Sequence, residues 1–438
     1  MPKFALSLFA ALFFLAHWLI LPDLPLTRKI PAFMAAFAMS AMSMAFILAV
    51  RWPIVERLSG GLDKSYRLHR WFGLTALIGI VGHWLLVPGG AGQALFPMLA
   101  GLGEELGEVS LYALLILIAL SAIQVLPYRW WRYSHYAMGP VFAVAVMHTF
   151  LSDIPLALGS LAWNCMLAVS TLGLIAWIWK FVRDTRYKPS YHVSSVRTLP
   201  GTTEITLEPI SLPIRHRAGQ FAFVSFDLDG LREPHPFTIA SADAGGELRF
   251  AIKALGDFTE ELQRSSLLSC TARVEGPYGR FSYRRGPKKQ VWVAGGIGIT
   301  PFLAFLQELA PDHPYTVDLV YCVRSQHTAL YLDELTEQSK RLQHVKLHVL
   351  ASDEGNRLNP SWAEASLQTG WHSAGFWFCG PESLRGGVEE LMREFAISPR
   401  KLKYEYFDMR GAVRVSASDL YRQGRRFLQE IKQRLVKW

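Results

Sequence analysis

Six apolar runs fill the first 180 residues of this 438-residue chain, whose composition is 51% hydrophobic and only 18% charged. As a helix, each run is about long enough to cross the roughly 30 Å hydrocarbon core of a bilayer, and some of them barely. The runs lie near residues 4–21, 31–50, 69–88, 109–126, 136–151 and 161–179. The sequence therefore predicts an α-helical transmembrane bundle of six helices, in contact with membrane lipid.

The charges between these runs predict an orientation. Basic residues concentrate in the connection 51–70, in the short loop before His135 and after the last run. The connection 89–108 carries three glutamates and no Lys or Arg, whereas Arg28 and Lys29 in the other outer loop oppose this pattern. Because Lys and Arg favour cytoplasmic loops, we predict an integral protein of the cell membrane with both termini in the cytoplasm. The first run has no small-residue cleavage site, so we interpret it as an uncleaved helix.

Four histidines lie inside the apolar runs in two pairs. His69 and His83 are fourteen residues apart, which in a helix covers about 21 Å and returns to within about 40° of the same face. His135 and His148 are thirteen apart, which leaves them about 140° apart in an ideal helix. Gly139-Pro140 between them could bend the helix and re-aim one ring. We expect His69 and His135 to share the inner level and His83 and His148 the outer one.

Histidine pairs on facing helices indicate a bound metal cofactor. Neutral imidazole is a common metal ligand, and helix bundles build cofactor sites from facing side chains. The predicted cofactors are two haems, each with two axial histidines. A single histidine in a membrane helix, such as His17, would more often bond to a carbonyl or face a water-filled cavity.

The remainder of the chain has the composition of a soluble protein. After Pro189, short alternating runs separated by Gly, Pro and Asp predict a small antiparallel β-barrel; they read ITLEPI, FAFVSF, FTIAS, LRFAI and ARVEG. From Lys288, four apolar strands alternate with helices, which predicts a parallel sheet with a nucleotide at the carboxyl ends of its strands.

Two chemistries are excluded by composition. The net charge of +9 does not indicate nucleic-acid binding, because many basic residues of the first half lie at helix ends, where membrane orientation accounts for them. The four cysteines are far apart in sequence, so neither a disulfide framework nor a cysteine-ligated iron–sulfur cluster is expected.

The sharpest local motif is VWVAGGIGITP, in which a glycine turn joins a buried strand to a helix that begins near Thr300 and Pro301. Gly295, Gly296 and Gly298 would let backbone amides approach a pyrophosphate at the positively polarised helix end. A glycine turn alone would be weak, since many such turns are structural.

Four motifs in this half resemble the ferredoxin-reductase-like flavoproteins: HPFTIAS and GDFT, then EGPYG and FCGP. The resemblance implies FAD and nicotinamide contacts from His235, Pro236, Phe237, Thr238, Ser241, Gly256, Asp257, Thr259, Gly276, Gly279, Cys379 and Gly380.

Together with the four histidines, the chain from about residue 30 to residue 410 resembles the ferric reductase and NADPH oxidase superfamily. The resemblance implies that the histidine pairs ligate two b-type haems. It places Phe237 along the flavin ring, Thr238 near flavin N5, and His235 where soluble relatives often use an Arg for the pyrophosphate. Cys379 would lie beside the nicotinamide. Alternatively, His235 and Phe237 are only strand residues and Cys379 is a buried thiol.

Two assignments concern nucleotide choice and the flavin cover. Arg324 and Ser325 follow the second strand of the nucleotide fold, where an Arg can pair with a ribose phosphate, so NADPH is favoured over NADH. Phe407 resembles the family's aromatic flavin cover, although the chain continues for about thirty residues beyond it. That basic, amphipathic tail could lie on the inner membrane surface or pack on the reductase domain.

The predicted domains are a transmembrane haem domain (1–187), an FAD-binding β-barrel (188–286), an NAD(P)H-binding α/β domain (287–410) and the tail (411–438). The predicted function is electron transfer from cytoplasmic NADPH through FAD and both haems to a ferric chelate or dioxygen outside, with Thr238, Cys379 and Phe407 at the flavin. Flavin is needed because a hydride carries two electrons and haem iron accepts one. The alternatives are a membrane-anchored flavin reductase that feeds a partner protein, and a haem-bearing assembly or sensor subunit.

Overall fold

The computed structural model describes residues 16–88, 93–94, 96–122, 128–154, 157–185 and 188–404. The chain forms two compact units, and the described residues up to Thr185 belong to the first and residues 188–404 to the second. The domain boundaries predicted at residues 187, 286 and 410 stay predictions.

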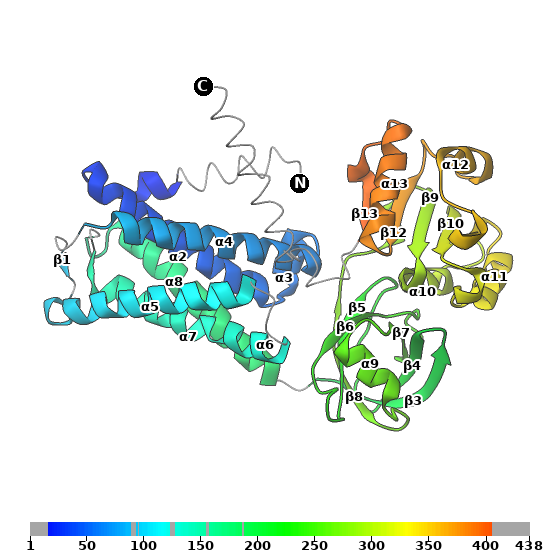
Figure 1. The fold of residues 1–438 in the computed structure, drawn as a ribbon, viewed down its shortest axis with the longest axis horizontal. Coiled ribbons are helices and arrows are strands. Elements are labelled where there is room, and N and C mark those ends of the chain that lie inside the picture. Colours follow the sequence, from blue (N-terminus) through cyan, green and yellow to red (C-terminus); the bar gives the residue numbers. More distant parts are fainter. Residues whose placement is uncertain are drawn as a thin grey trace, which may run out of the picture. The chain divides into compact units, whose positions relative to one another are not determined.

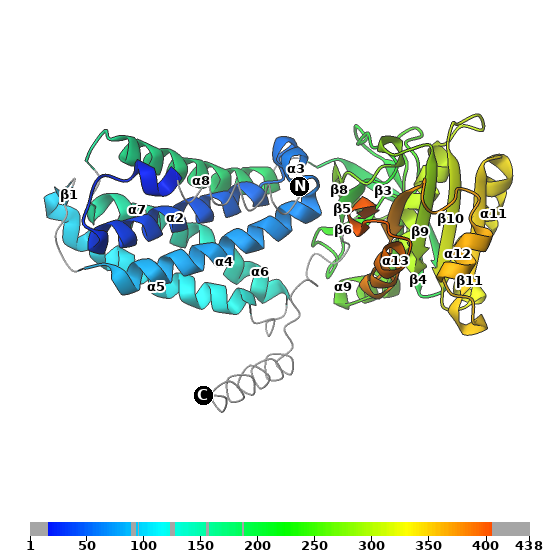
Figure 2. The ribbon, with the colours of Figure 1, turned by 90° about the horizontal axis from the view of Figure 1, so that it is seen from above.

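The first unit is a bundle of helices whose long members run side by side in both views (Figures 1 and 2). Its helices are α2 Leu26–Ala49, α3 Pro53–Ser59, α4 Leu62–Leu86, α5 Ala100–Ala122, α6 Tyr128–Tyr136, α7 Met138–Leu151 and α8 Leu161–Thr185. A short antiparallel pair, β1 Gln93–Ala94 and β2 Asp153–Ile154, joins two connections at the end of the bundle opposite α3 and α6 (Figures 1 and 2).

Small residues let these helices approach closely, as is typical of membrane helices. A Cβ added at Gly79 of α4 would lie 3.0 Å from both Ala38 Cβ and Met34 O of α2. A Cβ at Gly173 of α8 would lie 2.7 Å from the Phe142 ring, and Phe142 is fully buried at the centre of the bundle core. Side-chain volume at these crossings therefore fixes the helix spacing.

Several predicted connections are helical. Glu104, Glu105 and Glu108, expected in an outer loop, lie in the first turns of α5, and the expected loop 51–70 contains α3 and the start of α4. The apolar runs marked the apolar part of these helices but not their polar ends. Among the described residues, Leu26–Ala49 and Leu161–Arg183 are long and apolar enough to cross a membrane by length and composition. Six spans therefore stay a prediction.

The second unit begins with a six-stranded antiparallel sheet, ordered β6-β5-β8-β3-β4-β7. Its strands are β3 Ser190–Leu199, β4 Thr202–Pro209, β5 Phe221–Phe226, β6 His235–Thr238, β7 Leu248–Lys253 and β8 Thr271–Tyr278. One bridge between Ile239 and Phe250 joins the two edge strands, and helix α9 Asp257–Arg264 follows β7. The antiparallel β domain is confirmed, whereas a closed barrel stays a prediction.

A five-stranded parallel sheet follows, ordered β11-β10-β9-β12-β13. Its strands are β9 Lys289–Gly295, β10 Thr316–Val323, β11 Val345–Ala351, β12 Gly375–Cys379 and β13 Leu402–Tyr404, and its helices are α10 Thr300–Glu308, α11 Leu332–Arg341, α12 Pro360–Ser366 and α13 Glu382–Glu394. Alternate residues of β12 enter two different cores: Trp377 packs with α10 and Phe376 with α13. Helices therefore cover both faces, which confirms the predicted α/β nucleotide-binding fold.

Candidate functional site

The four histidines of the helical bundle form two facing pairs. The ring centroids of His69 and His135 lie 5.9 Å apart, and those of His83 and His148 lie 6.4 Å apart. His69 lies near the start of α4 and His135 on α6, at the end of the bundle that holds α3, whereas the other pair lies toward β1 (Figures 1 and 2). The bundle therefore has one histidine pair toward each end.

Each ring is oriented through Nδ1. The Nδ1–H groups of His69, His83 and His148 donate to backbone carbonyls at 2.8, 3.0 and 2.8 Å, and the acceptors are Ala45, Pro31 and Gly103 respectively. His135 Nδ1 lies 3.3 Å from Ser121 Oγ. A carbonyl can only accept a hydrogen bond, so Nδ1 carries the proton and Nε2 keeps its lone pair. Such an outer hydrogen bond is typical of metal-ligating histidines.

The spacing of the pairs fits a shared iron. Two imidazoles bound through Nε2 at about 2.0 Å each, with about 1.2 Å from each nitrogen to its ring centre, would place their ring centroids roughly 6.4 Å apart. Both observed separations, 5.9 and 6.4 Å, lie close to this value. The donor set therefore fits one bis-histidine haem at each level.

The expected phase conflict between His135 and His148 is resolved by a break in the helix. α6 ends at Tyr136, Ala137 is a turn, and α7 begins at Met138. Pro140 has no N–H to donate to the carbonyl four residues earlier, which weakens the helix at this point. Because His135 lies on α6 and His148 on α7, their rings need not keep the angular separation that one straight helix would impose.

A glycine pair on α5 was missed from the sequence. Gly103 supplies the carbonyl that accepts from His148, and a Cβ at Gly107 would lie 2.5 Å from both Cε1 and Nδ1 of that ring. The four-residue spacing places both glycines on one face of α5. GLGEELG could have indicated a close helix contact, although its glutamates resembled a solvated loop.

The glycine turn lies at the point where the order of the parallel sheet reverses. β9 pairs with both β10 and β12, and ligands of such sheets bind beyond the carboxyl ends of the strands at this reversal. Gly296 has φ +54° and open space around an added Cβ. Thr300 begins α10 directly after the turn, and its hydroxyl donates to the Ile297 carbonyl.

Gly295 and Gly298 were expected to leave room for a pyrophosphate, but in the structure they leave room for neighbouring parts of the chain. An added Cβ would lie 2.2 Å from the Cys379 carbonyl oxygen at Gly298, and 2.7 Å from Pro381 at Gly295. A Cβ at Gly380 would in turn lie 3.0 Å from Gly295. These residues bring the ends of β9 and β12 together, so their lack of a side chain is needed for packing within the domain.

The predicted flavin strand is β6. Thr238 is buried opposite Phe221, and the Phe237 ring stacks on Phe258 at 6.3 Å. The His235 ring also lies against Phe258, with centroids 3.8 Å apart. His235, Pro236 and Phe237 are partly exposed along this strand, so the structure brings the first motif together on one edge of the sheet.

The second motif forms a helix cap. Thr259 Oγ1 accepts from the backbone N–H groups of Leu255 and Gly256 and donates to the Gly256 carbonyl, at the start of α9, which begins at Asp257. A Cβ at Gly256 would meet nothing within 4 Å. The hydroxyl that resembled a cofactor contact is therefore engaged by the backbone.

The remaining predicted flavin residues lie in turns or have polar atoms that are hydrogen-bonded within the domain. Gly276 and Gly279 have φ +158° and +99° around the end of β8, conformations that favour glycine. Ser241 Oγ accepts from the Arg249 N–H, and the Ser241 carbonyl accepts from His216 Nε2.

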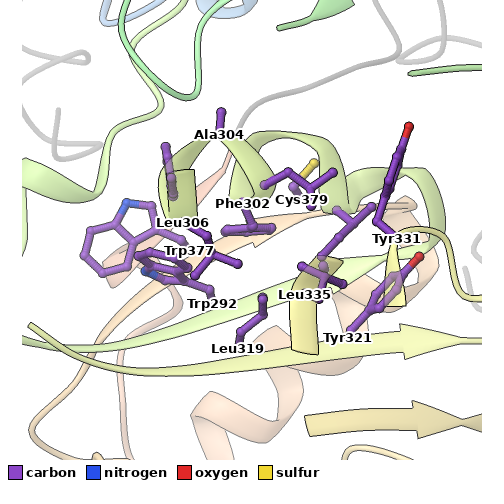
Figure 3. Close-up of a cluster of buried hydrophobic side chains, with 14 of the residues drawn as sticks. Trp292, Phe302, Ala304, Leu306, Leu319, Tyr321, Tyr331, Leu335, Trp377 and Cys379 are labelled. Atoms are coloured by element: carbon purple, nitrogen blue, oxygen red, sulfur yellow. The ribbon is translucent and has the colours of Figure 1, made fainter. Parts of the chain in front are cut away.

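Cys379 is buried at 1% exposure within the same hydrophobic cluster as Phe302 and Tyr331 (Figure 3). Its thiol therefore lies among core side chains, while its backbone reaches the glycine turn. Arg324 is exposed directly after β10, and Ser325 caps the short turn that follows. Phe407 and the tail lie outside the described residues.

Three family models match the chain in succession. A ferric reductase like transmembrane component matches residues 34–146, an FAD-binding domain matches 191–282, and an oxidoreductase NAD-binding domain matches 292–388. The first covers α2 to α7, the second the antiparallel sheet, and the third most of the parallel sheet.

Curated relatives are similar over parts of the chain. Ferric reduction oxidase 7, chloroplastic, of Arabidopsis thaliana is 34% identical over 152 residues, which are 30% of this chain and 20% of that protein. Methane monooxygenase component C of Methylosinus trichosporium is 30% identical over 31% of this chain and 41% of its own length. The plasma membrane-associated coenzyme Q6 reductase of Saccharomyces cerevisiae is 27% identical over 43% of this chain and 62% of its own length. The chain thus spans between a fifth and two thirds of these relatives.

Among solved structures, the FAD/NAD binding domain of nitric oxide dioxygenase from Vibrio cholerae covers 50% of this chain and 98% of its own, with 19% identity and a TM-score of 0.45. In sequence order, the three matched models join a transmembrane component to an FAD-binding domain and an NAD-binding domain. Over these segments the chain is similar to a ferric reductase like transmembrane component and to the FAD-binding and NAD-binding domains of oxidoreductases.

Proposed function

We propose that this protein carries electrons across the cell membrane, from cytoplasmic NADPH through FAD and two b-type haems to an acceptor on the outer side. The observation that carries the proposal is the pair of histidine levels, each with ring centroids near the separation that a shared iron requires. Two such centres at opposite ends of one bundle would divide the membrane into two short transfer steps.

The direction of transfer follows from charge. Arg57 and Lys64 lie at the α3 end of the bundle, and Arg183 near the end of α8 donates to the Val50 carbonyl there at 2.8 Å. Because basic residues favour the cytoplasmic side, we assign this end to the cytoplasm, with six spans and both termini inside. The His69 pair would then be the inner one, on the side where α8 continues into the reductase unit.

In the reductase unit, the sheet edge at β6 would hold the flavin, and the reversal between β9 and β12 would hold the nucleotide. FAD supplies the change from two-electron to one-electron transfer that a hydride donor and haem iron require. Gly296 would admit the pyrophosphate to the start of α10, and Arg324 would face the ribose phosphate. Cys379 would act through its backbone and the shape of the nearby core, since its thiol is buried.

The acceptor would be reduced at the edge of the outer haem. With two histidines on each iron, no coordination position remains for activating oxygen at the metal. A ferric chelate or dioxygen at the outer surface suits this arrangement.

An absorption spectrum of the purified protein tests the proposal first. Flavin with about two low-spin haems per chain, all reduced by NADPH, is expected. Absence of haem would favour a membrane-anchored reductase that feeds a partner protein, and haem that NADPH leaves oxidised would favour a sensor or assembly subunit.

Variants in oriented vesicles test the two levels. His148→Ala should stop reduction of an outside acceptor while NADPH still reduces the flavin and the inner haem. His135→Ala should instead block reduction of the outer haem. A soluble dye that takes electrons directly from the flavin should be consumed at a near-normal rate by both. Unchanged transmembrane reduction in His148→Ala would rule out the serial path.

A further inference from the structure

One charged cluster joins the flavin-binding sheet to the nucleotide-binding domain. Arg249 on β7 donates from both terminal nitrogens to the two carboxylate oxygens of Glu334 on α11, at 3.0 and 2.9 Å. Their side chains are only 16% and 25% exposed. This forked geometry is the strongest that a guanidinium and a carboxylate form.

Further contacts complete the cluster. Gln307 on α10 donates to Glu334 Oε1 at 3.0 Å, and Glu204 on β4 lies 4.0 Å from Arg249. The Tyr331 ring lies 5.3 Å below the Arg249 guanidinium, and Tyr331 itself adopts a left-handed backbone conformation, with φ +62°. Burial lowers the pKa of Arg249, but the hydrogen bonds and charges of Glu334 and Glu204 outweigh this and keep the pKa above its ordinary value.

The cluster touches backbone close to both predicted cofactor sites. Arg249 also donates to the Ala240 carbonyl at 3.2 Å, and the Ala242 N–H donates to Gln307 Oε1 at 3.0 Å. Residues 240–242 follow the flavin strand β6, with Ile239 between them. Gln307 lies on α10, the helix that begins at the glycine turn.

We propose that Arg249, Glu334 and Gln307 are positioning residues, which fix the distance between the nicotinamide and the flavin without touching either. The inference rests on the proposed function. In the reaction concerned, the C4–H bond of NADPH breaks and its hydrogen leaves with both electrons to form an N–H bond on the flavin. NADPH becomes NADP+ and the flavin is reduced by two electrons.

The physical reason is that hydride transfer depends steeply on distance, whereas a buried ion pair contributes little to stability. A misplacement of about 1 Å costs on the order of 100-fold in rate. Replacing a buried pair by apolar residues is often neutral for stability, so a fork of this quality between two domains is better explained by geometry than by stability.

The decisive variant is Glu334→Gln, which keeps the shape of the side chain and removes its charge. In the full-length protein in nanodiscs, stopped-flow reduction of FAD by NADPH should slow by about 10- to 100-fold. FAD content and the dissociation constant for NADP+ should stay unchanged, because Glu334 contacts neither site. Arg249→Lys keeps the positive charge but loses the forked geometry. Its rate of FAD reduction should therefore lie between those of the wild type and Glu334→Gln.

A second readout does not depend on turnover. In the same protein without added nucleotide, hydrogen–deuterium exchange of the segment 240–242 should accelerate in Glu334→Gln. Arg273→Gln is the matched control, because Arg273 pairs with Asp227 at 3.2 Å within the flavin sheet alone. It should leave both the exchange and the rate of FAD reduction unchanged.

The outcomes separate this inference from the proposed function. If NADPH fails to reduce the flavin of the wild-type protein, the proposed function is wrong. If the wild type is reduced and Glu334→Gln is reduced equally fast, the positioning role is wrong. The positioning role would also be wrong if the slower FAD reduction in Glu334→Gln were explained by a lower FAD content or a weaker affinity for NADP+. The same holds if Arg273→Gln slowed FAD reduction equally, since either result indicates a merely structural ion pair.

Discussion

Gly107→Ala should remove the proposed outer haem by displacing the His148 ring. The added Cβ would lie 2.5 Å from Cε1 and Nδ1 of that ring, whereas carbon atoms in contact are about 3.5 Å apart or more, so the ring must recede by about 1 Å. A metal–ligand bond tolerates only about 0.2 Å. The same shift would break the hydrogen bonds of His148 Nδ1 to Gly103 and Ser152, at 2.8 and 2.9 Å.

The loss can be estimated and measured. Removing an orienting hydrogen bond alone typically costs about 10- to 100-fold in metal affinity, and displacement of the ligand adds to this. The haem content measured by the pyridine haemochrome assay should fall from about two haems per chain to about one. The absorption spectrum of the native variant should show that the remaining haem is low-spin.

A matched control lies on the same helix. A Cβ at Gly101 would meet nothing within 4 Å, so Gly101→Ala should keep both haems. Retention of the inner haem in Gly107→Ala shows that the bundle still folds. Two normal low-spin haems in that variant would refute the assignment of His148 and the packing that supports it.

Three further predictions concern the second unit, residues 188–404. Arg324→Ala should raise KM for NADPH by up to about tenfold and leave KM for NADH unchanged, because an exposed cation pairs only with the extra phosphate; equal effects on both nucleotides would contradict this. Gly298→Ala should lower the Tm of the second unit strongly, because its Cβ would overlap the Cys379 carbonyl. Gly296→Ala is strained only by its φ of +54°, so it should lower the Tm less and should raise KM for NADPH. A larger loss of Tm in Gly296→Ala than in Gly298→Ala would contradict this. Burial raises the pKa of Asp318, but hydrogen bonds from His348 and two backbone amides outweigh this and lower it. That stabilisation is present above about pH 4 and lost below it, so Asp318→Asn should destabilise by about 1.5 to 3 kcal/mol at pH 7 and progressively less in acid, as measured by denaturant unfolding.

The sequence predicted most of the elements that follow a simple period. The apolar pattern predicted β4 to β8 in the first sheet and β9 to β12 in the second, but neither β3 nor β13. The break at Ala137 was harder to place, because Gly139-Pro140 indicated a bend but not which ring it would re-aim. The extent of α5 was missed, since its polar first turns resemble a loop in the sequence.

Contacts between distant segments could not be predicted. The clash of a Gly298 Cβ with the Cys379 carbonyl depends on the ends of β9 and β12 meeting, and a glycine motif does not distinguish that from room for a ligand. The Arg249–Glu334 fork joins residues 85 positions apart. Neither residue belongs to a motif, so only the folded chain could bring them to notice.

The carbonyl partners of His69, His83 and His148 have an evolutionary consequence. Because Ala45, Pro31 and Gly103 orient the rings through backbone oxygens, the first two positions can change side chain in related proteins without losing the bond, provided that the helix keeps its path. Comparison of related sequences would then show invariant histidines with no co-varying partners. The residue types at these positions could then change between relatives, while the carbonyl oxygens that orient the rings keep the same positions.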